Sequence, residues 1–249
     1  MKNTLSFIFS SVMLMFGSSC AKNLSIVNPV PISAVTVVNA VIGSSALIPD
    51  FSVDSVEYFS SALTVPFAGF HEYSVPSGMV PLNIYQITDT TNTTYKGTLD
   101  LAPNRIYTFF LCGADIQNGQ SSSDTLFTLD NPPYHDVTDS VVGVRFVNLL
   151  ADGNPISVNI KGIPYGSEVS SLTYKGVSSF QNYGATSSIG SYAFEFRDAM
   201  TDTLWASYTL SGINNSTSTV RFRNVTLVLS GRLGGTGSTA ISAFLVNNY

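Results

Sequence analysis

The sequence predicts an all-β protein built from two copies of one domain. Two observations carry this prediction: segments of the first half recur in the same order in the second half, and apolar and polar residues alternate in short runs separated by turn residues. Alternation with a period of two is typical of a half-buried strand. Outside the N-terminal segment, no long window shows the spacing of an amphipathic helix. Many short strands with regular turns favour a β-sandwich or a β-barrel.

Residues 1–19 have the features of a secretory signal peptide. Lys2 supplies a short positive start, residues 5–16 are rich in apolar side chains, and three small residues, Gly17 to Ser19, precede Cys20. The apolar segment is too short to cross a bilayer, which takes about 20 residues. We therefore expect this segment to direct export and to be removed.

Cys20 directly follows the small residues, and this placement resembles the lipobox of bacterial lipoproteins, although Gly17 stands where that motif usually has Leu. The resemblance implies that Cys20 is acylated and that residues 20–33 form a tether to the membrane. The alternative is an ordinary signal peptide followed by an unmodified cysteine. Cys112, the other cysteine, lies in an apolar run, so we expect it to be unpaired, buried and unreactive.

Four segments of the first half have counterparts in the second half. They are 35–39 with 144–148, 67–73 with 174–180, 95–99 with 206–210, and 107–113 with 225–231. We therefore predict a first repeat over 34–130, a polar linker with two prolines over 131–140, and a second repeat over 141–249. Alternating patterns predict strands at 82–87, 144–148, 156–160 and 192–196, and turn residues separate them at 76–78, 102–104, 151–155, 161–164 and 211–212.

The second repeat resembles family 4397 of the domains of unknown function. The residues that carry the resemblance are Val-Arg-Phe-Val-Asn at 144–148, Val-Asn-Ile-Lys-Gly at 158–162, Leu-Thr-Tyr-Lys at 172–175, and the strands at 192–197 and 225–231. The first repeat resembles the family more loosely, with Thr36 where the second has Arg145. The resemblance implies two tandem immunoglobulin-like β-sandwich domains in a lipoprotein of the Bacteroidota. It implies no catalytic motif.

Composition and motifs disfavour several function classes. Only 11% of the 249 residues are charged, 44% are hydrophobic, and the net charge of −5 includes no basic cluster, which argues against nucleic acid. His71 and His135 stand alone in polar segments, so we expect them at the surface. The glycine-rich run 231–237 lacks the Lys-Ser/Thr of a phosphate-binding loop and is expected to join two strands. Asp198 and Asp202 are expected to flank a turn. We predict no enzyme activity, no metal and no cofactor.

Two further patterns bear on modification and binding. Asp-Ser/Thr-aliphatic tripeptides resemble O-glycosylation sites of Bacteroidota envelope proteins, and their hydroxyl residues are Ser55, Thr90, Thr125, Ser140 and Thr203. The alternative is that Asp before Ser or Thr makes turns. Aromatic residues in loop-rich stretches are expected in the core, with stacking on sugar rings or a protein partner as the alternative. In the second repeat these are Tyr165, Tyr174, Phe180 and Tyr183.

Together these features predict a non-catalytic lipoprotein of the outer membrane that acts as a structural or binding module of the cell envelope. Its expected partners are the membrane, through the lipid anchor, and a glycan or envelope protein. The first alternative is a glycan-binding component of a polysaccharide-capture system. An outer-membrane β-barrel is less favoured, because its strands need about 9–11 residues. An enzyme is also less favoured. Residues 21–24 contain no acidic pair resembling a surface-export signal, which favours the periplasmic face over the cell surface.

Overall fold

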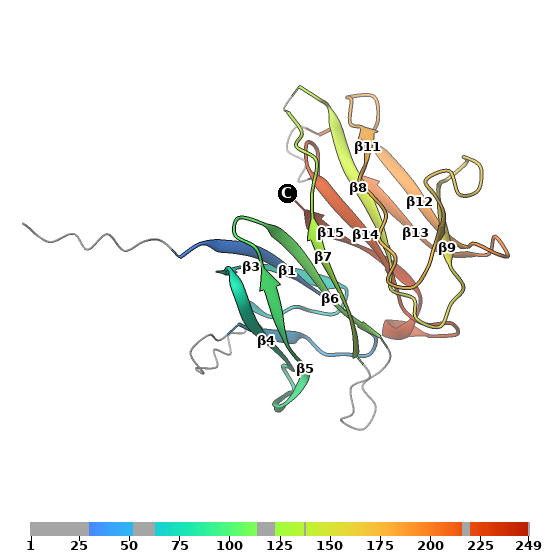
Figure 1. Cartoon of the computed structure of the whole chain (residues 1–249). Helices are drawn as coiled ribbons and strands as arrows, with labels where there is room; N and C mark the ends of the chain where they lie inside the picture. Colours follow the sequence, from blue (N-terminus) through green and yellow to red (C-terminus); the bar gives the residue numbers. More distant parts are fainter. Residues whose placement is uncertain (1–29, 52–62, 114–122, 137, 216–219, 249) are drawn as a thin grey trace, which may run out of the picture. The chain divides into compact units, whose positions relative to one another are not determined.

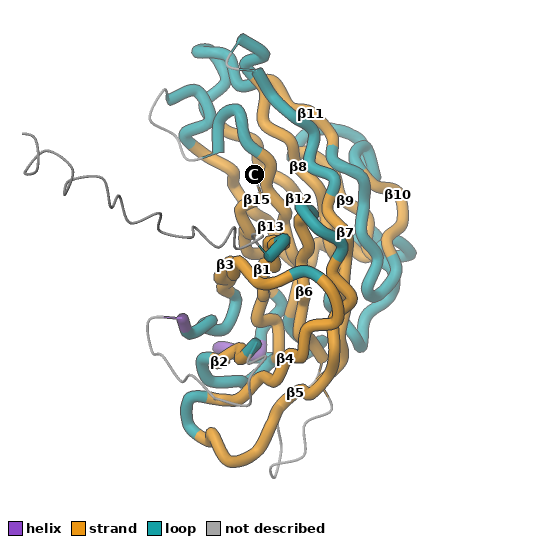
Figure 2. Tube along the Cα trace, turned by 60° about the vertical axis from the view of Figure 1, so that its left-hand side comes forward, coloured by secondary structure: helices purple, strands orange, loops and turns teal. Residues whose placement is uncertain are grey.

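The computed structural model describes residues 30–51, 63–113, 123–136, 138–215 and 220–248. The predicted signal peptide, Cys20 and Ser55 lie outside the described residues. Residues 31–249 form one compact unit. The predicted all-β class is confirmed, because strands and the loops between them make up nearly all of the described chain (Figure 2). A short 3-10 helix, η2 (Gly237–Thr239), interrupts the loop before the last strand.

The first half of the chain forms an immunoglobulin-like sandwich of two sheets (Figure 1). The larger sheet contains, in spatial order, β3 (Gly69–Pro76), β1 (Ile32–Val41), β6 (Ile106–Gly113) and β7 (Ser123–Asp130). The smaller sheet contains β2 (Leu47–Asp50), β4 (Gly78–Gln86) and β5 (Asp89–Leu101). Alternate residues of these strands point inward, and Val37, Leu82, Ile84 and Phe109 are among the buried residues of the core between the sheets.

The second half repeats this architecture. Its first sheet contains β11 (Gln181–Gly184), β8 (Val141–Asn148), β14 (Asn224–Ser230) and β15 (Ser242–Asn248), and its second contains β10 (Val169–Leu172), β9 (Ile156–Ile160), β12 (Ser191–Asp198) and β13 (Leu204–Ser211). Phe146, Phe194 and Phe196 fill the core between the sheets. The ring of Phe146 meets the other two rings edge-on, with centroids 5.3 and 6.1 Å away, which is a favourable geometry for aromatic pairs.

Three of the four pairs of recurring segments occupy equivalent strands, namely β1 with β8, β5 with β13 and β6 with β14. In the fourth pair, residues 67–73 run into β3, whereas residues 174–180 precede β11. In each sandwich the first strand runs parallel to the strand of the last recurring segment, so that Val35 faces Tyr107 across β1 and β6, and Val144 faces Val225 across β8 and β14. β7 and β15 then pair antiparallel with β6 and β14. The predicted strands at 144–148, 156–160 and 192–196 lie within β8, β9 and β12, and the one at 82–87 overlaps β4 but runs one residue past its end at Gln86. The glycine-rich run begins the hairpin between β14 and β15. The boundaries 34–130, 131–140 and 141–249, taken as domain limits, stay a prediction.

The two sandwiches share a third core, formed by the outer faces of the larger sheet of the first sandwich and the first sheet of the second. Residues of β1 and β6 contact residues of β8, β14 and β15 there; the buried members are Val38, Ala40, Phe110, Cys112, Val147, Leu149, Val228, Phe244 and Val246. Val38 and Val147 hold equivalent positions, as do Phe110 and Val228. The contact therefore brings together the same patch of each repeat, as in an approximate two-fold dimer.

Cys112 lies where the sequence predicts it, and His135 does not. Cys112 is fully buried in β6, as predicted, and burial raises the pKa of its thiol to about 11, so little reactive thiolate forms at neutral pH. The surface location expected for His135 is wrong. Its Nε2 lies 3.0 Å from Asn224 Oδ1 and its side chain is buried. Gly143 makes this possible, because a Cβ there would lie 2.0 Å from Asn224 Oδ1.

Candidate functional site

Two surface cavities are candidate sites. The larger, about 530 Å³, lies beside the contact between the sandwiches. It is lined by Thr128, Leu129, Asn131 and Pro133 of the first half and by Arg145 and residues 177–180 of the second. The smaller, about 260 Å³, lies on the outer face of the second sheet of the second sandwich. Ligand sites for drug-sized molecules span roughly 300–1,000 Å³, so volume alone favours the larger cavity. The side chains favour the smaller one.

The charged residue of the larger cavity is already engaged by the protein. Arg145 Nη1 donates to Asp130 Oδ1 at 2.7 Å, Nε donates to Thr226 Oγ1 at 2.7 Å, and Nη2 reaches Thr108 Oγ1 at 3.4 Å. The Phe180 ring covers the guanidinium at 4.8 Å. Arg145 and Asp130 are both buried and come from different sandwiches. We call this group the interdomain ion pair, and its geometry assigns it to holding the sandwiches together.

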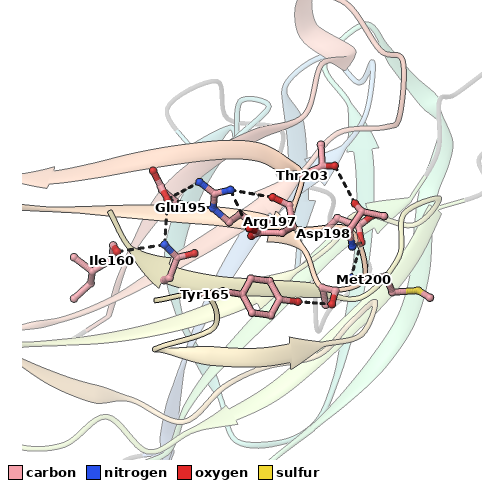
Figure 3. A network of polar contacts seen from close by, with 11 residues as sticks. Ile160, Tyr165, Glu195, Arg197, Asp198, Met200 and Thr203 are labelled. Atoms are coloured by element: carbon pink, nitrogen blue, oxygen red, sulfur yellow. Dashed lines mark hydrogen bonds and ion pairs between the residues drawn. The ribbon is translucent and has the colours of Figure 1, made fainter. Parts of the chain in front are cut away.

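The smaller cavity is built on adjacent positions of two paired strands. Glu195 and Arg197 are two residues apart in β12, so they lie on the same face, while Phe194 and Phe196 point into the core. Asn159 of β9 faces Glu195 across the sheet. With Asp202 and Tyr165 from neighbouring loops, these residues line the cavity. We call Asn159, Tyr165, Glu195, Arg197 and Asp202 the polar basket; Figure 3 labels Tyr165, Glu195 and Arg197.

Hydrogen bonds fix the charged groups of the polar basket. Arg197 donates from Nη2 and Nε to Glu195 Oε2, at 2.9 and 3.2 Å, and from Nη1 to the backbone oxygen of Asp202 at 2.9 Å. Asn159 Nδ2 donates to the same Glu195 oxygen at 3.1 Å. Burial raises the pKa of Glu195, but the bonds from Arg197 and Asn159 outweigh it and hold that pKa below its usual value. The carboxylate is therefore ionised at neutral pH.

The turn beside the polar basket is also held in place. Asp198 Oδ1 accepts hydrogen bonds from the backbone N–H groups of Met200 at 2.7 Å and Thr201 at 3.0 Å, and Oδ2 accepts from Asn154 at 2.9 Å. The hydroxyl of Tyr165 donates to the Ala199 carbonyl, which ties its loop to this turn (Figure 3). Asp198 and Asp202 thus flank a turn, as predicted, and Asp202 in addition pairs with Arg197.

Among the described residues, one buried atom of the polar basket lacks a partner. Asn159 is 3% exposed, and its Oδ1 is buried without a hydrogen bond in the described part of the protein. At the rim, by contrast, apolar side chains face solvent: Ile163 is 48% and Tyr165 44% exposed. The cavity therefore combines a preorganised polar floor with an apolar rim, as small-molecule sites do.

The other predicted residues are not brought together. Thr90 and Thr203 are exposed, Thr125 and Ser140 are half-buried, and they lie on separate segments of the chain. Asp89, which precedes Thr90, accepts a hydrogen bond from the Thr91 backbone at 3.0 Å, which fits the turn explanation. O-glycosylation stays a prediction.

The aromatic residues divide into two groups. Tyr183 lies in the core of the second sandwich, as expected. Tyr174 and Phe180 are half-buried beside the contact between the sandwiches. Tyr165 is not in the core; it lies at the rim of the polar basket.

No protein-family model matches the chain. No curated protein matches it. The resemblance to family 4397 therefore stays a prediction. Within the described ranges, no three His, Cys, Asp or Glu side chains come together as a metal site. The same residues include no helix long and apolar enough to cross a membrane.

Sequence reasoning missed the polar basket. Its signal was present: Glu195 and Arg197 alternate with two phenylalanines, so an ion pair on the outward face of that strand follows from the period of two. The sequence shows Tyr165 as an aromatic residue of a loop-rich stretch, for which ligand stacking is only the alternative to the core. The participation of Asn159 carries no such signal, because it depends on strand pairing.

Proposed function

We propose that the protein is a non-catalytic binding module of the cell envelope, with the polar basket as its ligand site and the joined sandwiches as its scaffold. The observation that carries the proposal is the preorganisation of the polar basket. Its carboxylates, guanidinium and tyrosine are held by bonds within the protein before any ligand arrives. Groups fixed in this way lose little conformational entropy on binding.

The chemistry of the polar basket fits binding better than catalysis. The described residues that line it include no Ser, Thr, Cys or His, the usual nucleophiles and proton carriers. A general acid or base works best with a pKa near the operating pH. The pKa of Glu195 is instead held below its ordinary range by Arg197 and Asn159 against the effect of burial. These features support a site that binds a ligand and releases it without changing it chemically.

The envelope location rests on the sequence of residues 1–24. A signal peptide followed by Cys20 supports a lipid anchor in the outer membrane, on the periplasmic face or at the cell surface. The test is metabolic labelling with a clickable palmitate analogue in the native host, followed by protease treatment of whole cells. Labelled wild type and unlabelled Cys20→Ser are expected. Absence of label on the wild type contradicts the anchor, and digestion by external protease contradicts the periplasmic face.

The ligand site is tested with ligand-observed NMR on the full chain and a library of small polar molecules. We expect binders whose signals disappear with Arg197→Gln, which removes the ion pairs to Glu195 and Asp202. Arg105→Gln is the matched control, because Arg105 is an exposed arginine in a turn of the first sandwich. Binders that are unaffected by Arg197→Gln, or no binders at all, would contradict the proposed site.

A further inference from the structure

We propose that the polar basket recognises one ring of a neutral saccharide. This inference rests on the proposed function and adds the chemical class of the ligand. It follows from three properties of the site: which hydrogen-bonding groups are unused, how the charges balance, and where the apolar surface lies.

The unused groups of the polar basket are mainly acceptors. Asn159 Oδ1 is buried and has no partner among the described residues. The N–H groups that reach Glu195 all bind Oε2, which leaves Oε1 for a ligand. Asp202 uses Oδ1 toward Arg197, which leaves Oδ2. A carboxylate accepts through both oxygens. A matching ligand must therefore present several donors close together.

The charges of the polar basket disfavour an ionic ligand. Arg197 contacts both carboxylates, with side-chain distances of 2.9 Å to Glu195 and 3.4 Å to Asp202. Lys161 adds a second positive charge that acts on Glu195. A metal ion or an ammonium group would approach these cations, and an anion would approach the carboxylates. Hydroxyl groups supply donors without a net charge, so the balance favours a polyhydroxylated ligand.

The shape of the site selects a ring with an apolar face. Tyr165 and Ile163 line the cavity together with the polar groups and remain about half exposed. A pyranose ring carries hydroxyls on its edge and C–H groups on its faces, so it can fill hydrogen bonds at the floor and contact the aromatic rim at the same time. The volume of about 260 Å³ restricts the enclosed part to one ring.

Titration of the full chain with simple glycosides tests the inference. Methyl α-glucopyranoside, α-mannopyranoside and α-galactopyranoside are added up to tens of millimolar, with saturation-transfer NMR as readout, beside calcium chloride, benzylamine and benzoate as ionic comparators. Calcium binding is followed by calorimetry. We expect at least one glycoside to bind with a millimolar Kd and the comparators not to bind.

Variants locate the binding. Asn159→Ala removes the unpartnered acceptor and should weaken glycoside binding about tenfold. Asn182→Ala, which removes an exposed asparagine from β11 of the same sandwich, should leave binding unchanged. Ile163→Ala, at the exposed rim, gives an independent variant that leaves the buried residues in place, and it should weaken binding several-fold.

The outcomes separate this inference from the proposed function. If an ionic comparator binds in place of the glycosides and Arg197→Gln abolishes that binding, the saccharide is wrong and the binding site stands. If glycosides bind but neither Asn159→Ala nor Ile163→Ala weakens their binding, the saccharide is not held in the polar basket. If neither glycosides, comparators nor library compounds bind, both proposals are wrong.

Discussion

In the described residues, the two sandwiches share seven equivalent strands, to which the second adds β10, and nearly the same apolar positions, but they carry different polar side chains on their outer faces. Thr36 of β1 and Arg145 of β8 occupy equivalent positions, because each lies beside an equivalent threonine, Thr108 or Thr226. The first sandwich supplies Asp130 at the end of β7, and the second has Asn248 at the equivalent place in β15. One arginine and one aspartate thus convert two similar faces into a complementary pair.

The other sheet shows a second difference of the same kind. Gly97 and Tyr208 hold equivalent positions in the recurring segments 95–99 and 206–210. Leu82 pairs with Gly97 and Phe194 with Tyr208, so Leu82 corresponds to Phe194. Asn83 and Tyr85 are therefore the counterparts of Glu195 and Arg197. Tyr85 is buried. The charged pair that builds the polar basket therefore belongs to the second sandwich. The comparison teaches that the apolar pattern sets the fold of both halves, whereas outward-facing polar residues give each half its own role.

Breaking the interdomain ion pair is the strongest test of that comparison. Arg145→Met leaves Asp130 buried without its cation, and removing one partner of a buried pair costs about 3–5 kcal/mol. The measurement is the free energy of unfolding from urea titration of the full chain.

The matched variant is the double substitution Arg145→Met with Asp130→Asn, which removes both charges. It should recover a large part of the loss, because no charge is left buried alone. A single substitution that costs less than about 1 kcal/mol would show that the apolar part of the interface suffices to hold the sandwiches.

Residues facing the cores were predictable from sequence, and residues joining the halves were not. The alternation around Phe146 and Phe194 predicted their strands because an inward-facing side chain obeys a period of two wherever it is. Arg145 shares the same run and points the other way, toward a partner 15 residues earlier in another sandwich. The period of two predicts on which face of the sheet Arg145 lies, but it does not predict which residues pack against that face. His135 was misplaced for the same reason, since its burial depends on Gly143 and Asn224.

The turn beside the polar basket should give a smaller effect. Asp198→Ala removes the acceptor of two backbone N–H groups and of Asn154. Hydrogen bonds to a charged group contribute about 1.5–3 kcal/mol, so we expect a loss near 2 kcal/mol in the same urea titration. Asp89→Ala, at the exposed start of β5 beside a turn of the first sandwich, is the control and should cost less than Asp198→Ala, because solvent screens the interactions of an exposed carboxylate. Equal losses would remove the contrast between the two turns.

Acid should act on the same group. Burial raises the pKa of Asp198, but bonds from Asn154, Met200 and Thr201 outweigh it and hold the pKa below its ordinary 3.8. The unfolded chain therefore takes up a proton first as the pH falls, and the stabilisation present above about pH 4 is lost below it. The wild type should lose more stability between pH 5 and pH 3 than Asp198→Ala does, measured by thermal unfolding. Parallel losses would contradict this contribution.

The smallest effect is expected at the exposed ion pair that also joins the two sandwiches. Lys175 Nζ lies 3.0 Å from Asp124 Oδ1, but the two side chains are 37% and 42% exposed. Water and salt screen such a pair, so its contribution is about 0–1 kcal/mol. Lys175→Asn is the suitable change, because Lys175 has a φ of 60° and asparagine tolerates this left-handed conformation. The free energy of unfolding should fall by less than 1 kcal/mol, and 0.5 M salt should reduce the difference further. A loss as large as that of Arg145→Met would mean that burial is not what distinguishes the two pairs, and that charge in general holds the sandwiches together.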